Sequence, residues 1–267
     1  MKSFLTWPGG KFTQLAQILP VLPKAERLIE PFVGGGSVFL NAGIQSVMIN
    51  DVNPDLTNLY NVIKHHGTKF IDDAEMLCKA ITSKTMYDSL RERFNTREYS
   101  NYSMAVFFLV LNRTCFNGMC RYIQSREFNV PWGKDPEVYF PRAELESFMA
   151  SVHKLEIFST DFASVMMLAR AGDVVFCDPP YEPMPGKEGF TTYSGKKFTF
   201  ADQVRLVEAA VKIKPRGVST VITNSSAPSI IKLYEDNGFK IQPLIARRSV
   251  AAKAESRGNV EDIIAIL

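Results

Sequence analysis

The sequence is poor in cysteine and histidine, the residues that form disulfides and most zinc sites. Its four cysteines, Cys78, Cys115, Cys120 and Cys177, are spread along 267 residues without a CxxC pair, and only three histidines accompany them. Neither a disulfide framework nor a structural zinc site is therefore expected. We predict that the protein uses no metal.

Long hydrophobic runs are absent as well. The longest apolar stretch, residues 104–111, is far short of the roughly 20 residues that span a bilayer. The N-terminus reaches Pro8-Gly9-Gly10 too soon for the apolar region of a signal peptide. We expect a soluble protein that contacts no membrane and works in a reducing cytoplasm, either of a cell or of the host of a virus.

No residue class or charge sign dominates the composition. Hydrophobic residues make up 46% and charged residues 22%, with 16 Gly and 15 Pro, which excludes disordered, collagen-like and coiled-coil chains. At roughly 150 residues per domain, the length fits one large or two modest domains. The net charge of +3 neither requires nor excludes a polyanionic partner, so charge must be considered locally.

Short apolar segments alternate with helical patterns at both ends of the chain. Residues 27–30, 47–50 and 173–177 have the pattern of buried parallel strands, and a glycine-rich turn and an expected helix over 37–41 separate the first two. Further elements are expected as strands over 155–158, 218–222, 238–241 and 262–267 and as a helix over 201–213. This alternation is typical of an α/β fold with a parallel sheet.

The middle of the chain follows a different pattern. Apolar residues recur at helical spacing over 55–111, and residues 112–139 are aromatic, basic and rich in turns. The simplest account is a discontinuous α/β domain, residues 1–55 and 154–267, into which a mainly helical domain is inserted at 56–153.

A glycine-rich loop, EPFVGGGS, follows the first expected strand. It departs from the dinucleotide fingerprint GxGxxG because Phe39 stands at the last position, which argues against a dehydrogenase. Asp51 ends the second strand, where an acid can accept hydrogen bonds from both ribose hydroxyls. Upstream, Trp7 offers an apolar wall and Lys11 a point charge for a carboxylate. Each segment alone would also fit an ordinary turn, but together they predict a site for an adenosine cofactor without a pyrophosphate.

The tetrapeptide Asp178-Pro179-Pro180-Tyr181 follows the expected strand 173–177, at the edge where α/β proteins bind ligands. Because proline has no backbone N–H, the two prolines offer no hydrogen-bond donors, and their carbonyl groups can only accept hydrogen bonds. Asp178 and the Pro179 carbonyl could accept from one planar amino group, and Tyr181 offers a ring face to an aromatic base. The arrangement fits direct attack of an exocyclic amine on an activated methyl group, without a covalent nucleophile. A simple strand-ending turn is the alternative.

Together these segments resemble a known family. FLTWPGGK, EPFVGGGSVFLN, INDVN, LNRTCFNGMCRY, EFNVPWG and DPPY look like the motifs, in the same order, of Dam-type DNA adenine N6-methyltransferases, which recognise GATC. The resemblance covers most of the chain and implies a Rossmann-like S-adenosylmethionine-dependent methyltransferase fold with an inserted, mainly helical target-recognition domain. It also implies S-adenosyl-L-methionine as cofactor, GATC-containing double-stranded DNA as substrate and base flipping. We expect the protein to act as a monomer.

Carried over residue by residue, the resemblance implies three groups of functional residues. The residues that would hold the flipped adenine are Asp178, Pro179, Pro180 and Tyr181. Those expected to contact the cofactor or shape its pocket are Trp7, Lys11, Phe32, Gly34, Gly36, Asp51, Phe162 and Asp178. Those expected to bind DNA lie in a DNA-reading hairpin over 112–134 and are Arg113, Phe116, Asn117, Met119, Arg121, Pro131 and Lys134.

The residue types in this hairpin suit the binding of a duplex from which one base has been flipped out. Phe116 could fill the gap, Met119 could touch a thymine methyl, and Arg121 could bind guanine O6 and N7. The chain departs from the family twice, with Phe116 where Tyr is common and with Thr6 where close relatives carry Lys near the DNA. A solvated loop remains the alternative here, and the basic residues of 247–257 could contact phosphates or form an exposed turn.

Two other functions stay open. The same tetrapeptide chemistry also serves RNA adenine and protein glutamine methylation. A DNA-binding module with a vestigial cofactor fold is the non-enzymatic alternative, although the acceptors Asp51 and Asp178 argue against it.

Overall fold

The computed structural model describes residues 1–123, 125–135, 138–151, 154–184, 198–245 and 261–267. The basic cluster predicted at 247–257 lies outside these residues. No helix within the described ranges is long and apolar enough to cross a membrane.

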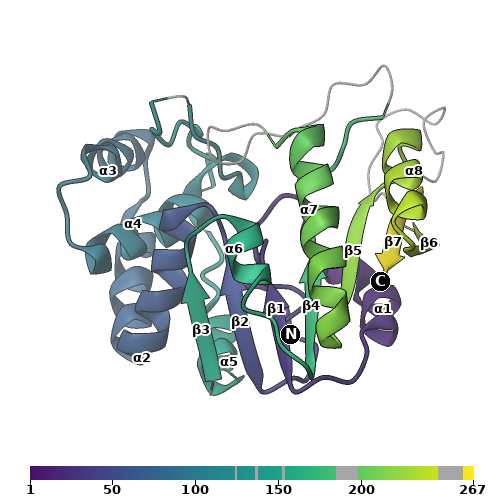
Figure 1. Cartoon of the computed structure of the whole chain (residues 1–267). Helices are drawn as coiled ribbons and strands as arrows, with labels where there is room; N and C mark the ends of the chain where they lie inside the picture. The colour runs from purple at the N-terminus through teal and green to yellow at the C-terminus, as the bar shows by residue number, and fades with distance from the viewer. Residues whose placement is uncertain (124, 136–137, 152–153, 185–197, 246–260) are drawn as a thin grey trace.

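A seven-stranded sheet, counted over the described residues, forms the centre of the molecule (Figure 1). Its strands are β1 Arg27–Glu30, β2 Ser46–Asn50, β3 Lys154–Phe158, β4 Asp173–Cys177, β5 Ser219–Ser225, β6 Lys240–Ile245 and β7 Glu261–Ile266. The order is β3-β2-β1-β4-β5-β7-β6, with the first five parallel and β7 antiparallel to both neighbours. This sheet confirms the predicted α/β, Rossmann-like fold, and it places the carboxyl ends of β1, β2 and β4 at one edge.

Helices account for most of the remaining described chain. They are α1 Leu15–Ile18, α2 Pro54–Ala80, α3 Lys84–Thr96, α4 Asn101–Thr114, α5 Arg142–Ser151, α6 Phe162–Met166, α7 Phe200–Ile213 and α8 Pro228–Asp236, with 3-10 turns η1 Phe12–Gln14, η2 Leu19–Val21, η3 Phe116–Gly118 and η4 Lys214–Arg216. A polar residue directly before each of four long helices caps its N-terminus. These caps are Asn53 for α2, Ser83 for α3, Ser100 for α4 and Thr199 for α7. The helices predicted over 55–111 and 201–213 are therefore confirmed.

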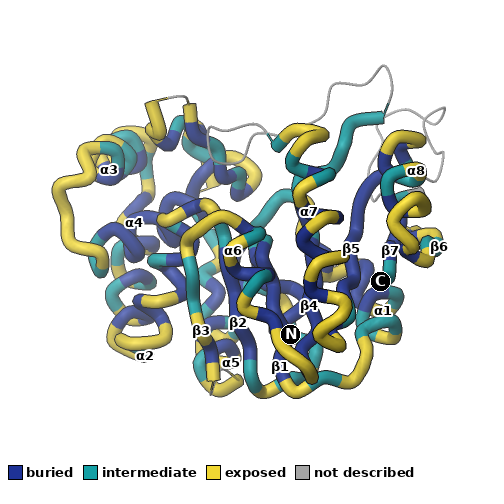
Figure 2. The backbone as a smooth tube through the Cα atoms, in the orientation of Figure 1, coloured by how far each residue is buried: buried dark blue, intermediate teal, exposed yellow. Residues whose placement is uncertain are grey.

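Apolar layers cover both faces of the sheet, because successive strand residues point to opposite sides. Leu28 of β1 packs in one cluster with α2, α4 and α5, and its neighbour Ile29 packs in the other with α6, α7 and α8. Figure 2 shows the central strands β1, β2, β4 and β5 mainly in the dark blue of buried residues, the edge strand β3 mostly in teal and yellow, and the outer helix surfaces in yellow. The helices of the predicted insertion thus share a core with the sheet. The division at residues 55 and 153 stays a prediction.

The helix predicted over residues 37–41 is wrong, because these residues form turns. A single helical hydrogen bond joins the Leu40 N–H to the Gly36 carbonyl. The stretch lies between Gly36 and Gly43, which both have positive φ. Backbone in that region cannot continue a right-handed helix, and the residues between the two glycines suffice for little more than one turn.

The strand predicted over 238–241 begins at Lys240 instead. Gly238, whose φ is +77°, donates its N–H to the Glu235 carbonyl and so closes the end of α8. A glycine of positive φ just past a helix is a common helix stop, and it delays the strand by two residues.

A buried ion pair joins β1 to β4 at the amino ends of these strands. Arg27 Nη2 lies 2.6 Å from Asp173 Oδ2, and Arg27 Nε donates to Asp173 Oδ1 at 3.1 Å. The parallel register places these two residues opposite each other. The Asp173 side chain is only 2% exposed, and the other carboxylate near Arg27, that of Glu156 at 3.5 Å, is 55% exposed, so Asp173 is the buried partner of the Arg27 charge.

Replacing Asp173 by Asn should leave the Arg27 charge buried without its carboxylate. We expect the free energy of unfolding to fall by about 3–5 kcal/mol, measured by urea denaturation. Asp236→Asn is the matched control, because it breaks the exposed Lys232–Asp236 pair and should cost less than about 1 kcal/mol. Equal losses in the two variants would contradict a structural role for the buried pair.

Candidate active site

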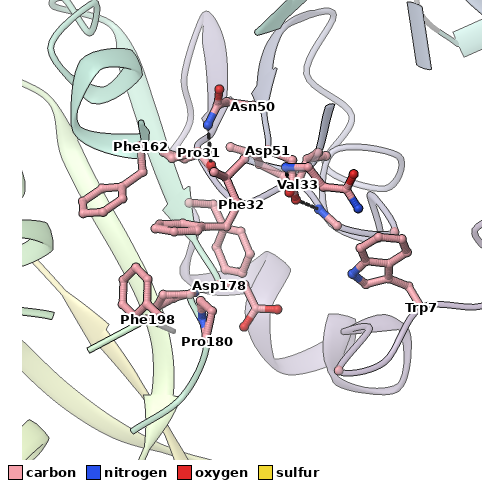
Figure 3. A pocket seen from close by; sticks show the side chains of 18 of the residues that line it. Trp7, Pro31, Phe32, Val33, Asn50, Asp51, Phe162, Asp178, Pro180 and Phe198 are labelled. Carbon is pink, nitrogen blue, oxygen red and sulfur yellow. Dashed lines mark hydrogen bonds between the residues drawn. The ribbon is translucent and has the colours of Figure 1, made fainter. Parts of the chain in front are cut away.

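A pocket of about 710 Å³ lies at the carboxyl ends of β1, β2 and β4 (Figure 3). Segments far apart in the sequence form its walls: the N-terminal loop, the glycine-rich loop after β1, the residues after β2, the start of α6 and the loop after β4. Every residue predicted for the cofactor or for catalysis lines it, namely Trp7, Lys11, Phe32, Gly34, Gly36, Asp51, Phe162, Asp178, Pro179, Pro180 and Tyr181.

The Asp178 carboxylate is held from two sides. Lys11 Nζ lies 2.7 Å from Oδ2, and Thr223 Oγ1 donates to Oδ1 at 2.6 Å. Each carboxylate oxygen can accept two hydrogen bonds, so both retain room for one more. Asp178 can therefore still accept from a planar amino group in the pocket.

Lys11 has a partner that the sequence did not reveal. We predicted that it would hold a cofactor carboxylate, but its ammonium group pairs with Asp178 and also donates to the Gly9 carbonyl at 2.7 Å. The same ammonium lies 4.9 Å from the centre of the Tyr181 ring, within cation–π range. One of its three N–H groups is left for a ligand.

A buried polar network fixes the loop after β4. Gln203 Nε2 donates to the Pro180 carbonyl at 2.9 Å, and Asn224 Nδ2 donates to Gln203 Oε1 at 3.0 Å. Asn224 Oδ1 accepts from the Glu182 N–H at 3.2 Å, and Ser225 Oγ donates to the Glu182 carbonyl at 2.6 Å. Sequence reasoning missed this network. The available signal was the run of three polar residues, 223–225, that follows the two apolar residues of β5.

The glycine-rich loop approaches the N-terminal loop and α2 closely. Gly34 has a φ of +47°, and a Cβ there would lie 2.8 Å from Trp7 Nε1. Gly36 has a φ of +73°, and a Cβ there would lie 2.5 Å from a Phe39 ring carbon. Tyr60 Oη donates to the Gly34 carbonyl at 3.0 Å and fixes the loop from α2. Only glycine permits this backbone course so near the aromatic rings.

Asp51 follows β2 and faces the glycine-rich loop. Its Oδ2 accepts from the Gly34 N–H at 3.2 Å and its Oδ1 from the Asn53 N–H at 2.9 Å. Burial raises the pKa of Asp51 to about 6, against the opposing effect of these two bonds. The carboxyl group is therefore mostly ionised at neutral pH and has acceptor positions free for two hydroxyl groups of a ligand.

Three phenylalanines form an apolar side of the pocket. The Phe32 ring centre lies 5.1 Å from that of Phe162 and 5.7 Å from that of Phe198. In Figure 3 these rings lie on the side opposite Trp7, with Asp178 between. The guanidinium of Arg205 covers the Phe162 ring at 4.9 Å. Such a surface suits a flat aromatic base, and Phe198 and Arg205 were not predicted from the sequence.

Glu30, the last residue of β1, is a further pocket residue that sequence reasoning did not single out. It is 2% exposed, and its Oε1 has no hydrogen-bond partner. Burial, with a smaller contribution from the Asp178 charge, raises the pKa of Glu30 well above its ordinary value. The unpartnered oxygen is an acceptor for a ligand donor. An acid directly before the glycine-rich loop was the available signal.

Acidic groups outnumber basic ones around the pocket. Arg205 pairs with Asp161 and Asp202, but no salt bridge among the described residues involves Glu30 or Asp51. The excess of acids favours a ligand that carries positive charge. Within the described part of the chain, no three His, Cys, Asp or Glu side chains are placed to hold a metal ion.

The predicted DNA-binding residues lie outside this pocket, in the last turn of α4 and between α4 and α5. We call residues 112–134 the recognition segment. Its two arms run antiparallel, with bridges from Cys115 to Trp132 and from Tyr122 to Phe128, and η3 interrupts the first arm. The arms thus lie side by side in antiparallel fashion, and that they form a DNA-reading hairpin stays a prediction.

Exposure divides the predicted DNA-binding residues. Met119 and Arg121 are half-buried, and Arg121 Nε donates to Asn129 Oδ1 at 2.9 Å. The exposed ones, which a partner can reach, are Phe116, Asn117, Pro131 and Lys134.

Arg113 is largely engaged within the protein. Its Nε and Nη2 donate to the Tyr139 carbonyl, and its Nη1 donates to Thr6 Oγ1 at 2.8 Å. Thr6 also touches Gly118, where a Cβ would lie 2.3 Å from the Thr6 Cβ. The recognition segment therefore packs against the N-terminal loop, one residue before Trp7.

Comparison with known proteins points to one family. The profile described as D12 class N6 adenine-specific DNA methyltransferase matches residues 7–250. A DNA N-6-adenine-methyltransferase of Escherichia phage P1 is 47% identical over 100% of this chain, which spans only 35% of that protein's length.

Bacterial relatives match over nearly their whole length. The DNA adenine methylases of Vibrio cholerae and of Escherichia coli K12 are 35% and 36% identical, over 99% of this chain and 95% of theirs. Among solved structures, a precorrin 8W decarboxylase aligns over 98% of this chain and 92% of that one, but a TM-score of 0.38 at 11% identity is too low to support any conclusion.

The buried Glu30 should make stability depend on pH. Above 4.5, its ordinary pKa, the unfolded chain loses the proton that the folded chain retains, so the free energy of unfolding falls as pH rises toward the raised pKa. Glu30→Gln should flatten this dependence and stabilise the protein at about pH 8 relative to wild type, in urea denaturation at about pH 5 and about pH 8. Exposed Glu208→Gln is the control, and an unchanged slope in Glu30→Gln would refute the assignment.

Proposed function

Because the chain belongs to the family of D12 class N6 adenine-specific DNA methyltransferases, we propose that it transfers a methyl group from S-adenosylmethionine to N6 of adenine in GATC sites of duplex DNA. One observation carries the proposal. A single pocket gathers the acid after β2, the glycine-rich loop and the Asp-Pro-Pro-Tyr loop, which lie far apart in the sequence. The residues proposed to bind the cofactor therefore lie next to those proposed to accept hydrogen bonds from the adenine amino group.

The pocket fits S-adenosylmethionine in size and charge. About 710 Å³ lies within the usual range of small-molecule sites, roughly 300–1,000 Å³. Asp51 would accept from the ribose hydroxyls, and the excess of acids over bases in the lining suits a cationic ligand, while the unpartnered Glu30 oxygen could accept from a ligand donor. When bound, this cofactor supplies an electrophilic methyl group on a sulfonium. The other residues proposed to hold it are Trp7, Lys11, Phe32, Gly34, Gly36, Phe162 and Asp178.

The loop after β4 would hold the adenine. Asp178 and the Pro179 carbonyl accept from the N6 amino group and orient its nitrogen, while Tyr181 stacks on the base. Lys11 and Thr223 fix the orientation of the Asp178 carboxylate, so the amine meets an acceptor that is already in place. Pro180 stiffens the loop between them.

The recognition segment would read the site. A base inside a duplex cannot reach the pocket, so we propose that it is flipped out and that the exposed Phe116 fills the gap. Arg121 would bind the guanine and Met119 a thymine methyl. The other proposed DNA contacts are Asn117, Pro131, Lys134 and, with less of its guanidinium free, Arg113.

The division of labour follows from these placements. We propose that residues 1–55 and 154–267 bind the cofactor, that residues 56–153 contact DNA, and that one copy of the chain suffices for both. The family match favours DNA over RNA or a protein glutamine as the substrate. Its relatives belong to bacteria and a bacteriophage, which supports action in a bacterial cytoplasm.

Incubation with methyl-labelled cofactor and a duplex library tests the reaction. We expect label on N6 of adenine within GATC and none on duplexes without that site. Asp178→Ala should abolish transfer, because the amine loses its acceptor, while GATC binding in a gel-shift assay persists. Label on RNA or protein but not on duplex GATC would contradict the proposal, and normal turnover by Asp178→Ala would contradict the role of this residue.

Arg121→Ala should relax discrimination at the guanine. Loss of a bidentate contact is expected to reduce the preference for guanine over another base by about 1–3 kcal/mol, measured as the ratio of kcat/KM on matched duplexes. Lys134→Ala is the control, because a phosphate contact should weaken binding equally on all sequences and lower its salt dependence. A uniform loss in Arg121→Ala would identify Arg121 as a phosphate contact.

A further inference from the structure

Residues 51–55, which comprise the loop after β2 and the first two residues of α2, face two sites at once. Asp51, at their start, lines the proposed cofactor pocket. Asp55, at their end, faces the other way and accepts two side-chain hydrogen bonds. Tyr122 Oη donates to its Oδ2 at 2.7 Å, and Arg97 Nη1 donates to its Oδ1 at 2.6 Å. Residues 51–55 therefore carry both an acid that lines the proposed cofactor pocket and a second acid that binds a different set of partners.

Asn53 connects the two acids. Its N–H donates to Asp51 Oδ1 at 2.9 Å, and its own Oδ1 accepts from the Asp55 N–H at 3.0 Å, as the cap of α2. Its Nδ2 donates to Cys120 Sγ at 3.7 Å. Asn53 is 4% exposed, so these bonds are shielded from water. A shift of Asp51 therefore reaches Asp55 through direct bonds.

Asp55 holds the recognition segment from both arms. Tyr122 belongs to the first arm and packs edge-on against Phe128 of the second, with ring centres 5.8 Å apart. Arg97, which ends α3 in a left-handed conformation, also donates to the Arg126 carbonyl near the tip at 3.3 Å. The Asp55 carboxylate thus ties the tip of the segment to the start of α2.

The contacts of Asp55 are of a strong kind. Both involve an ionised acceptor, and hydrogen bonds to charged groups are stronger than neutral ones. The Asp55 side chain is 14% exposed and Tyr122 is 9% exposed, so water replaces the Tyr122 contact poorly, whereas the Arg97 side chain is 37% exposed and its contact is more open to water. Without them the tip would lose its link to the loop that carries Asp51.

We propose that Asp55, Tyr122 and Arg97 are positioning residues that set the recognition segment on DNA and couple it to Asp51, so that cofactor and DNA each raise the affinity for the other. The identity of the two ligands rests on the proposed function. The sign follows because each ligand would favour the same bonded arrangement of residues 51–55, so the second ligand to bind finds that arrangement already selected. By linkage, the coupling factor is the same in both directions.

Calorimetric titration measures the coupling. Sinefungin, an unreactive analogue of the cofactor, is titrated into the protein with and without a GATC duplex. For wild type we expect the duplex to tighten sinefungin binding at least about fivefold, the low end of typical coupling. In Tyr122→Phe and in Asp55→Asn this ratio should fall toward one, while sinefungin affinity without DNA stays within about twofold of wild type, because the pocket is untouched. In turnover, KM for the duplex should rise more than kcat falls.

Tyr87→Phe is the matched control. The Tyr87 hydroxyl is also buried and also donates to the recognition segment, to the Val130 carbonyl at 2.7 Å, but it does not touch residues 51–55. Thermal unfolding should show a similar loss of stability for Tyr87→Phe and Tyr122→Phe. Only the latter should lose the coupling, which a general loosening of the segment would not produce.

The outcomes separate the two proposals. No coupling in wild type, wild-type coupling in Tyr122→Phe, or equal loss of coupling in Tyr87→Phe would overturn the positioning role. A wild-type chain that binds sinefungin and duplex with coupling, yet transfers no methyl group, would refute the proposed reaction and uphold the coupling. Tyr122→Phe removes a single oxygen atom, so the test survives even if Asp55→Asn fails to fold.

Discussion

The pocket depends on the ion pair between Lys11 and Asp178. An ionised carboxylate in a half-buried place is costly unless a cation stands beside it, and the Lys11 ammonium, 2.7 Å away, is that cation. The pair also fixes where the N-terminal loop lies, because Lys11 can reach Asp178 only if this loop crosses the end of β4. Trp7 comes to the pocket with the same loop, packed against Gly34.

The charge inside the pocket is left unbalanced. Lys11 compensates Asp178, but Asp51, which is mostly ionised at neutral pH, has no basic partner among the described residues, while burial raises the pKa of Glu30 and favours its protonated form. Such acids destabilise the fold at neutral pH, since the unfolded chain would release their protons more easily. A cationic ligand would relieve the imbalance. The same buried acids that lower the stability of the fold thus make the pocket favourable for a positively charged ligand.

The recognition segment is built into the same body as the pocket. Helices α2, α4 and α5 share an apolar cluster with one face of the sheet, and the loop after β2 joins this strand directly to α2. The Thr6 contact with Arg113 adds a second link, from the N-terminal loop. If the recognition segment reads the duplex as we propose, these links keep it at a fixed distance from the pocket, as an enzyme needs when one face recognises a site and another binds the target base.

The sequence alone determined most of the strands, the long helices and the motif residues that line the pocket, although not Glu30, Phe198 or Arg205. Strands such as β4 are short apolar runs, and the motifs that follow β1, β2 and β4 had to meet because parallel strands end at one edge. It failed over residues 37–41, where two glycines of positive φ override a helical pattern. Only the tertiary structure decided the strand order and the ion pair of Lys11 with Asp178. It also decided that Glu30 Oε1 has no hydrogen-bond partner and that Tyr122 donates to Asp55. The reason is physical: a local pattern encodes what a residue is and which side of its element it faces, whereas the partner of a charge is set by where distant parts of the backbone come to lie.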